Sequence, residues 1–597
     1  MAILMRRALT TTTAAILAFC ASADEWHVYS ETRDGLSGTQ QLTNAFRRAQ
    51  SGDTITIHAG TYNVPTEEMT FRYETDENGT LHASDGTCLD SSATDLIVRG
   101  DPEASRDEIV LSGLGANDAT KDGQHAIMRL NGKNCKVRHL TFYRGLANSN
   151  YLVYRNGKQL NTDIWIYRRG GGLNLGDATS VCEDCVFDKC YAGQGACIYG
   201  GGEARNCVFK NSNAVANNSG CAVCDAKAVY DSVFDSNARG SLRNCSVVAS
   251  NCVFVANWHT GSSGLLYYHT GGLVDCVFSN NTTVCAYLHG AKYMPKEITR
   301  CVFWNNSDST YSAGIGGSVP CTAPVKDCTF VGNLQISNVT AKISDCVFAS
   351  GSARGVIADC SDVEDCRFEG DGETTLTGAS GAEIAAFDRC SFKRCSFTGT
   401  RLHWAYGFRD CHRLEDCLIT ESVQWGTGAL FCHSDGADAT YVNCTIVTNG
   451  ALNTMFANTA GTGTITFKNT LFHNNKVSGQ TFGKFDFYSS DNTGFGTLYM
   501  DHTVYRAGNN NAKAVVAGFG IENMLWKSYD PKFKGADDPV NPYAIKRKSP
   551  CVAAGQIETW METATDLAGN PRLRDGKVDI GCYQNWDPVP GMLLMLR

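Results

Sequence analysis

A short pattern of apolar and polar positions repeats through the middle of this chain. Cys252, Phe254 and Asn257 form the phrase Cys-x-Phe-x-x-Asn, which returns at Cys276, 24 residues later. Complete, weaker or altered copies start at Cys185, Cys207, Ser232, Cys252, Cys276, Cys301, Cys328, Cys346, Cys366, Cys395, Cys417, Cys444 and Thr470. These thirteen starts span 285 residues in twelve steps, so the period is about 24 residues, which is typical of solenoid and propeller folds.

The order of residues within the repeat indicates which solenoid forms. The cysteine and the phenylalanine stand two positions apart, so they are predicted to face the same side of a short strand, and both residue types favour burial. The asparagine tolerates a left-handed backbone, and it predicts a turn that is stacked from one repeat to the next. A period of about 24 residues is too short for a four-stranded propeller blade. The chain is therefore predicted to be all-β, a single-stranded parallel β-helix with an apolar interior.

These motifs resemble those of right-handed parallel β-helix proteins of the pectin-lyase-like superfamily. The closer resemblance is to chains with polymorphic-outer-membrane-protein-type repeats, whose two signatures are Phe-x-x-Asn and Gly-Gly followed by a small apolar residue. The first signature begins at Phe234, Phe254, Phe278, Phe303, Phe330 and Phe472; the second is complete at 171–173 and degenerate at 219–221, 263–265, 313–315 and 427–429. The resemblance covers roughly residues 95–475. It implies a right-handed β-helix but says little about activity, because function depends on sites grafted onto a fold.

The two ends of the chain carry patterns of their own. Residues 1–23 combine two arginines with an apolar run and a small-x-small cleavage pattern, which is typical of a signal peptide and predicts export. Residues 24–94 are predicted to form an N-terminal helical cap and first coil, and the repeats follow over 95–475. Residues 476–597 are predicted to hold the final coils and a C-terminal cap over the open strand edge. No apolar stretch reaches about 18 residues, so no transmembrane helix is predicted.

Charge and cysteine content narrow the function classes. The net charge of −9 argues against nucleic acid as a partner. Most of the 28 cysteines recur at inward-facing positions of the repeat, which favours a stacked ladder of buried thiols. A disulfide framework is the alternative, because it is usual in exported chains. The pairs Cys182/Cys185 and Cys221/Cys224 have the spacing of a redox or zinc site, but so cysteine-rich a repeat produces this spacing by chance. No metal or cofactor is predicted.

Residues 143–170 interrupt the repeat and are predicted to form an insertion loop. Insertions into a solenoid form loops on one face, which is often the binding face. Trp165 and Arg168 are the predicted substrate-binding residues of this loop. An aromatic plane stacks on a sugar ring, and an arginine pairs with a carboxylate or a sulfate. The alternative is a loop that packs its own aromatic side chains against the coil.

A second aromatic cluster lies on the rungs themselves, between residues 258 and 293. The predicted catalytic set is His269, His289, Tyr268 and Lys292. Histidine and tyrosine serve as general acids and bases, and the two histidines are expected one rung apart. The predicted substrate-binding residues are Trp258, His259, Tyr267, Tyr287 and Tyr293. A polar, aromatic stripe without catalysis is the alternative. A third, less regular cluster of arginine, histidine and aromatic residues spans 401–413.

Motifs of enzymes with this fold provide a test of activity. Of the polygalacturonase motifs, Asn-Thr-Asp occurs at 161–163, but Asp-Asp does not follow until 537–538, and Gly-His-Gly and Arg-Ile-Lys are missing. The calcium-dependent pectate-lyase pattern is missing as well. The sequence favours an exported or cell-surface protein, expected to be a monomer, that binds an extracellular polysaccharide or cell-surface glycan. A wider form of this hypothesis includes cleavage by a lyase or glycoside hydrolase. The alternative is a non-catalytic, adhesin-like or structural surface protein.

Overall fold

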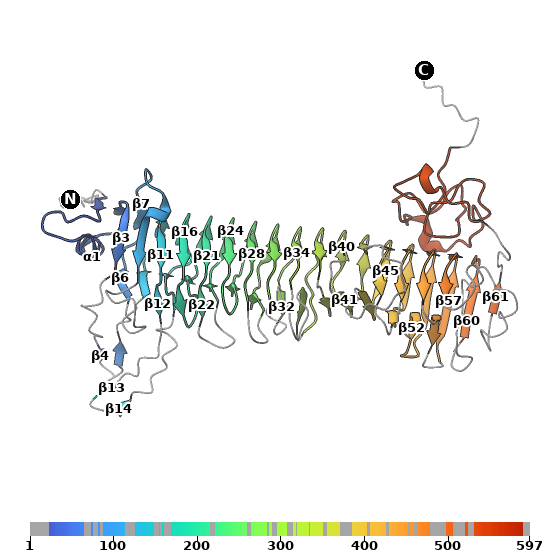
Figure 1. The fold of residues 1–597 in the computed structure, drawn as a ribbon, viewed down its shortest axis with the longest axis horizontal. Coiled ribbons are helices and arrows are strands. Elements are labelled where there is room, and N and C mark those ends of the chain that lie inside the picture. The colour runs from blue at the N-terminus through green and yellow to red at the C-terminus, as the bar shows by residue number, and fades with distance from the viewer. Residues whose placement is uncertain are drawn as a thin grey trace, which may run out of the picture.

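Short parallel strands wind into one elongated solenoid, as the computed structural model shows (Figure 1). The structure describes residues 23–64, 73–75, 81–83, 87–113, 126–147, 154–155, 158–159, 169–214, 221–258, 264–282, 286–288, 295–306, 314–317, 319–332, 335–349, 355–370, 385–402, 406–424, 429–451, 454–458, 462–477, 497–504, 520–522 and 530–588. All but the last residue of the predicted signal peptide lies outside this set.

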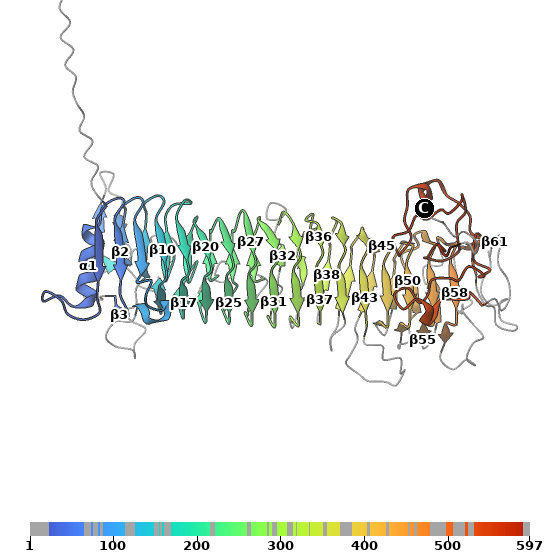
Figure 2. The same ribbon diagram turned by 90° about the horizontal axis from the view of Figure 1, so that it is seen from above.

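Three parallel sheets run along the solenoid, and successive coils add strands to each of them. The first sheet has 19 strands, the second has 16, and the third runs from β6 (Thr87–Ser91) to β59 (Lys476–Val477). Figure 2 shows the strands of the first sheet, such as β20 and β27, alongside those of the second, such as β25 and β31. The prediction of an all-β parallel β-helix is therefore confirmed.

The strands that matter below belong to two groups of consecutive coils. In the first sheet they are β20 (Glu203–Arg205), β24 (Ala228–Tyr230), β27 (Val248–Ser250), β45 (Ser391–Lys393) and β49 (Arg413–Glu415). In the second sheet they are β21 (Val208–Lys210), β25 (Val233–Asp235), β28 (Val253–Val255), β31 (Val277–Ser279), β34 (Val302–Trp304), β50 (Leu418–Thr420), β54 (Thr445–Val447) and β58 (Leu471–His473). In the third sheet they are β19 (Ile198–Gly200), β23 (Val223–Cys224), β26 (Leu242–Arg243), β29 (Leu266–Tyr267) and β32 (Ala286–Leu288).

The repeated phenylalanine forms a continuous stack inside the solenoid. Phe254 of β28 is in register with Phe234 of β25 and with Phe278 of β31. Its ring centroid lies 4.7 Å from each of theirs, and all three side chains are fully buried. Each such aromatic pair adds about 0.5–1.5 kcal/mol to the stability that burial alone supplies. The stack therefore holds the coils at a common register.

The repeated cysteine is buried as predicted, but it does not lie on the strand. Cys252 occupies the turn between β27 and β28, immediately before the strand that carries Phe254. The 25 cysteines whose side chains the structure describes are all free and buried. Within that part of the chain the thiol ladder is confirmed, and the disulfide framework is not observed.

The repeated asparagine forms a buried ladder of side-chain amides rather than a left-handed turn. The Nδ2 of Asn257 donates to the backbone oxygen of Phe234 at 2.8 Å and to Oδ1 of Asn281 at 3.1 Å. The left-handed residue is the one before it, Ala256, with φ of 53°. The expectation of a stacked turn is right, but its backbone mechanism was misassigned. The side-chain amide points inward because it forms hydrogen bonds with backbone groups that have no strand partner in the turn.

Helix α1 (Gly38–Arg48) lies at the N-terminal end of the solenoid (Figures 1 and 2). It begins with a capping box, in which Ser37 accepts from the Gln40 backbone N–H and the Gln40 side chain accepts from the Ser37 N–H. Its apolar face buries Leu42, Ala45 and Phe46, as the spacing predicts. Among the described residues, no helix is long and apolar enough to cross a membrane.

The C-terminal segment, residues 530–588, packs on the flank of the last coils. Its Ile545, Cys551, Ile580 and Cys582 form one apolar cluster with residues of β50, β54 and β58, including Leu418, Val447 and Leu471. Among the described residues, the segment predicted as the C-terminal cap therefore contacts the side of the solenoid (Figure 1).

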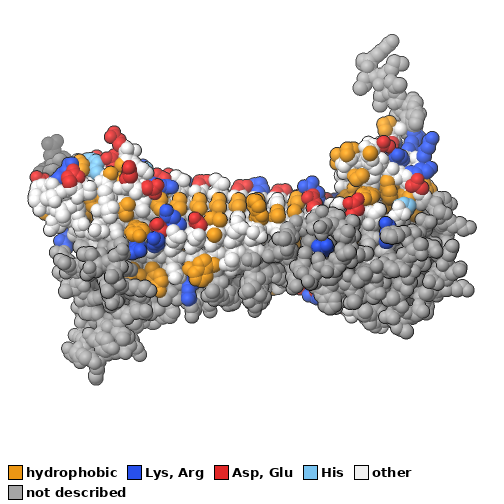
Figure 3. Space-filling view, viewed as in Figure 1, with side chains coloured by type: hydrophobic (Ala, Val, Ile, Leu, Met, Phe, Trp, Pro, Cys, Tyr) orange, Lys and Arg blue, Asp and Glu red, His pale blue; other side chains and the backbone are white. Residues whose placement is uncertain are grey.

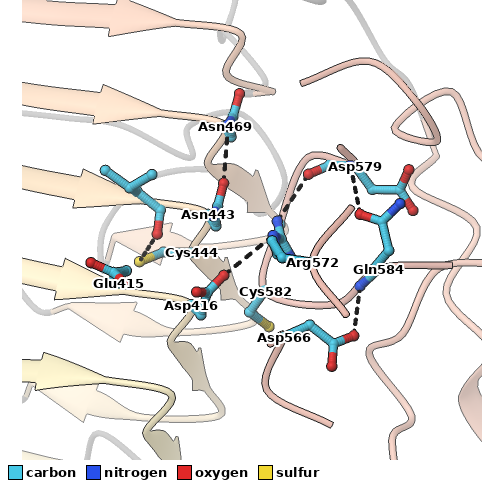
Figure 4. Close-up of polar contacts among 12 residues, drawn as sticks. Glu415, Asp416, Asn443, Cys444, Asn469, Asp566, Arg572, Asp579, Cys582 and Gln584 are labelled. Carbon is cyan, nitrogen blue, oxygen red and sulfur yellow. Dashed lines mark hydrogen bonds and ion pairs between the residues drawn. The ribbon is translucent and has the colours of Figure 1, made fainter. Parts of the chain in front are cut away.

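Arg572 anchors this segment in the solenoid wall (Figure 4). Its side chain is fully buried, and its Nε lies 3.4 Å from Oδ1 of the equally buried Asp416. Its Nη2 also donates to the backbone oxygen of Asp579 at 3.0 Å. Burial raises the pKa of the Asp416 carboxyl to about 7, and the nearby Arg572 opposes that rise.

The outward face of the second sheet carries a row of apolar side chains. Its members are in register and half-buried: Val208, Val233, Val253, Val277 and Val302. Figure 3 shows this row as a line of hydrophobic side chains along the solenoid. Further along the same sheet, polar residues such as Arg367 and Ser396 interrupt these positions before Leu418 and Leu471, which the C-terminal segment covers.

Candidate functional site

Six of the eleven predicted site residues lie outside the described part of the chain. They are Trp165, Arg168, His259, His289, Lys292 and Tyr293. For Tyr287 the structure gives only its place in β32. The catalytic and binding roles predicted for these seven residues remain predictions.

His269 lies inside the coil rather than on its surface. Its side chain is 4% exposed, and its Nε2 lies 3.2 Å from the backbone oxygen of Gly272. Tyr268, just before it, has a φ of 55°, and His269 is buried after this left-handed position. Burial lowers the pKa of His269 to about 4, so the imidazole is neutral at neutral pH. A neutral imidazole with so little exposure cannot reach a polysaccharide, so the structure does not support His269 as a catalytic residue.

Trp258 and the two tyrosines lie on different parts of the coil. Trp258 is 41% exposed in the connection between β28 and β29, where it bridges to Ala238 and Thr282 of neighbouring coils. Tyr267 belongs to β29 of the third sheet, and Tyr268 follows it directly. The structure therefore separates Trp258 from the tyrosines but keeps Tyr267 and Tyr268 together.

The third sheet brings polar and aromatic side chains of four successive coils into one line. Tyr199 of β19 is in register with Cys224 of β23, which pairs with Arg243 of β26, and Arg243 pairs with Tyr267 of β29. Adjacent strands are about 4.8 Å apart, so the line advances by that step from coil to coil. We refer to Arg169, Tyr199, Arg243, Tyr267 and Tyr268 as the arginine–tyrosine row.

Cation–π contacts link the members of the arginine–tyrosine row. The guanidinium carbon of Arg169 lies 4.6 Å from the ring centroid of Tyr199, and that of Arg243 lies 5.3 Å from the ring centroid of Tyr268. The hydroxyl of Tyr267 donates to that of Tyr268 at 3.0 Å. The two arginine–tyrosine distances fall within the range over which an aromatic ring attracts a cation. The row is therefore held in place before any ligand arrives.

A carboxylate supports the centre of the row. Asp225 accepts a hydrogen bond from Nδ2 of Asn244 at 2.6 Å. Burial, together with the hydrogen bond to Asp225, raises the pKa of Tyr199 well above its ordinary value. The Tyr199 hydroxyl therefore stays protonated, and Asp225 accepts its hydrogen.

Sequence reasoning missed Tyr199, Asp225 and Arg243. They carry no repeat signature, because outward positions of the coils differ in residue type from one coil to the next. Aligning the third strand of each coil, from the glycine signature onward, would have placed Tyr199, Cys224, Arg243 and Tyr267 in one column.

Metal-binding geometry is not found in the described residues, where no three His, Cys, Asp or Glu side chains gather closely enough to hold an ion. The Cys182/Cys185 and Cys221/Cys224 pairs are free and buried. Burial raises the pKa of the Cys182 thiol well above its ordinary value, so it is a neutral thiol.

No protein-family model matches the chain, and no curated protein matches it. Solved structures with weak similarity include pectin methylesterase PemA from Erwinia chrysanthemi, at 10% identity over 49% of this chain and 92% of that chain, with a TM-score of 0.23. A mannuronic-acid-specific family 6 lyase from human gut microbiota matches at 11% identity over 83% and 91%, with a TM-score of 0.24. The Agl-KA catalytic domain matches at 12% identity over 85% and 69%, with a TM-score of 0.28. At these TM-scores the similarities carry no argument about activity.

Proposed function

We propose that this protein is exported and binds an extracellular polysaccharide along its third sheet. The observation that carries the proposal is the arginine–tyrosine row, in which two arginines lie against tyrosine rings on successive coils. Tyrosine presents an apolar ring face and a polar hydroxyl, which suits a sugar ring and its hydroxyl groups. A polysaccharide is itself a repeating chain, so it can engage several coils of a repeating surface at once.

The charge of the row favours an acidic polysaccharide. Arg169 and Arg243 are both half-buried, and a guanidinium in such a place binds a carboxylate or sulfate through paired hydrogen bonds. Asp225, the carboxylate described beside the row, already accepts from Asn244. A uronate or sulfate group would therefore meet a locally basic surface on a chain whose net charge is −9.

Binding is proposed without cleavage. His269 is buried and neutral, and Tyr199 holds its proton too tightly to act as a base near neutral pH. Catalysis by His289 and Lys292 stays a prediction. Their removal provides the separate test, because it should leave binding by the row intact.

The test compares the mature chain, from Asp24, with row variants on a panel of neutral, carboxylated and sulfated polysaccharides. Arg243→Ala and Tyr268→Ala should each weaken binding by at least about tenfold, which corresponds to about 1.4 kcal/mol. Tyr230→Ala is the matched control: it removes the ring 4.9 Å from Arg205, a similar pair on the first sheet. Its binding should equal that of the unmodified chain.

Ultraviolet absorbance from unsaturated uronates, recorded on the same samples, reports cleavage. Absorbance that vanishes in His289→Ala would add catalysis to the function. If Tyr230→Ala weakens binding as much as the row variants do, the row is not the site. If no polysaccharide binds at all, the adhesin-like or structural alternative replaces the proposal.

A further inference from the structure

A cavity lies far along the solenoid from the arginine–tyrosine row, where the C-terminal segment meets the first sheet. Its volume is about 460 Å³, within the range of about 300–1,000 Å³ that small-molecule sites occupy. Strands β45 and β49 form one wall, and residues 560–565 form the other. We refer to it as the cap groove, and its lining includes Lys393, Arg394, Arg413, Glu415, Trp560 and Thr565.

The sheet wall of the cap groove is built around one buried carboxylate. Glu415 is 3% exposed, and it accepts from Nη2 of Arg413 at 2.6 Å and lies 3.4 Å from Nζ of Lys393. Both cations stay accessible, with side-chain exposures of 65% for Arg413 and 40% for Lys393. One carboxylate thus orients two cations but neutralises only one charge.

A third cation is fixed from behind the wall. Arg394 donates through Nε and Nη2 to the two oxygens of Asp365, at 2.7 Å each, and its Nη2 also contacts Glu364. Glu364 in turn pairs with Lys342. These ion pairs hold the Arg394 side chain in one position, so its placement beside the groove costs little entropy when a ligand binds.

The opposite wall presents an indole. Trp560 belongs to the short helix η5 (Thr559–Glu562) and packs beside the cluster formed by Val442, Met561 and Val578. Its Nε1 donates to Oε2 of Glu558 at 2.6 Å, and Glu558 also pairs with Lys468. The indole is therefore held by apolar packing and by its nitrogen, and it remains half-buried at the groove.

We propose that the cap groove binds a hexuronate, a sugar ring that carries one carboxylate. Three cations line it: Arg394 is paired with Asp365 and Glu364, whereas the more exposed Lys393 and Arg413 share the one lining carboxylate, Glu415. Arginine and lysine donate charge-assisted hydrogen bonds to a carboxylate, and an indole face suits the apolar side of a pyranose ring. A cavity with both features recognises charge and ring together, which neither a free inorganic anion nor a neutral sugar supplies.

This site is separate from the arginine–tyrosine row. The row lies on the third sheet in coils around residues 169–268, whereas the cap groove lies on the first sheet around residues 393–415. The inference does not rest on the proposed function, because a hexuronate could bind the groove whether or not a polymer binds the row. The two can therefore fail independently.

The experiment is calorimetric titration of the full mature chain with D-galacturonate, with D-galactose and inorganic sulfate as parallel probes. Galacturonate should bind, and galactose and sulfate should each bind at least about tenfold more weakly. Arg413→Gln should weaken galacturonate binding by at least tenfold. The matched control is Arg367→Gln, which removes an equally exposed arginine paired with Glu369 on the second sheet, and it should leave binding unchanged.

A second variant keeps all the charges and fills the space instead. Ala564 lines the groove, so Ala564→Trp should block galacturonate in a chain whose melting temperature is unchanged. Arg243→Ala, in the row, should leave galacturonate binding intact. Equal binding of galactose, binding that survives both groove variants, or no binding of galacturonate to the unmodified chain would each overturn the inference.

Discussion

The buried asparagine ladder makes a quantitative prediction about one side chain. Asn257 is fully buried, and its Oδ1 accepts from the backbone N–H of Asn237 at 2.9 Å. Its Nδ2 donates to the backbone oxygen of Phe234 at 2.8 Å. Asn257→Ala removes both contacts and leaves two backbone groups in the interior without their side-chain partner.

The magnitude follows from those two groups. A buried backbone donor or acceptor that loses its partner costs about 1–3 kcal/mol. Asn257→Ala should therefore lower the free energy of unfolding by about 2–6 kcal/mol. The loss should be local, because coils of a solenoid contact chiefly their neighbours.

The chain itself supplies the control substitution. Ser212 occupies the ladder position one coil before Asn237, where its Oγ accepts from the Cys190 N–H at 3.2 Å. Asn257→Ser should likewise keep an acceptor for the Asn237 N–H while losing the donor to Phe234. It should therefore recover about 1–3 kcal/mol relative to alanine.

Urea unfolding followed by circular dichroism measures the global change, and amide hydrogen exchange of the peptide around Asn237 measures the local one. Alanine should speed exchange at Asn237 more than serine does. If the two variants lose equal stability, or if each loses less than about 1 kcal/mol, then the ladder does not stabilise the coils by satisfying backbone groups.

Two further predictions concern buried ionisable groups. Burial lowers the pKa of His269 from 6.5 to about 4, so between these pH values the unfolded chain binds a proton that the folded chain does not. This residue should therefore lower the free energy of unfolding by up to about 3 kcal/mol as the pH drops from 6.5 to 4. His269→Gln should shrink the difference between the urea midpoints measured at pH 4 and at pH 7. An unchanged difference would refute the lowered pKa of His269. Arg572→Met removes the partner of the buried Asp416, so it should lower the free energy of unfolding by about 3 kcal/mol and expose residues 530–588 to limited proteolysis. Arg547→Met, at an exposed position, should change neither stability nor proteolysis. Equal protease resistance of the two variants would show that Arg572 does not anchor the segment.

The fold could be predicted because inward positions must satisfy the same constraints in every coil. Phe254 and its equivalents each fill the same slot of the interior, so the sequence repeats where the structure repeats. Outward positions meet no such constraint. Tyr199 and Arg243 share one line on the third sheet, but nothing in their sequence neighbourhoods marks that line, and only the strand register reveals it.

Two other features could not be predicted from the sequence, for different reasons. The cap groove joins Arg413 to Trp560, and no local pattern predicts that pairing. The burial of His269 follows from the left-handed backbone of Tyr268, and tyrosine is not a residue type that signals such a conformation. Enrichment of histidine and tyrosine in that stretch therefore suggested an exposed catalytic set where the structure buries its first histidine.

The attachment of the C-terminal segment to the side of the solenoid has a consequence for changes in the number of coils. Arg572, Cys582 and their neighbours attach to coils around Asp416 and Thr445, on the flank of the rod. Coils nearer the N-terminus share the phenylalanine and asparagine positions of the repeat, and Cys276 and Cys301 begin two of them 25 residues apart. Recombination between these two copies would delete one whole coil, shorten the rod by about 4.8 Å and preserve the phenylalanine and asparagine stacks. Gene-level gain and loss of repeats can thus tune the length of the rod while the attachment of its C-terminal segment is inherited unchanged.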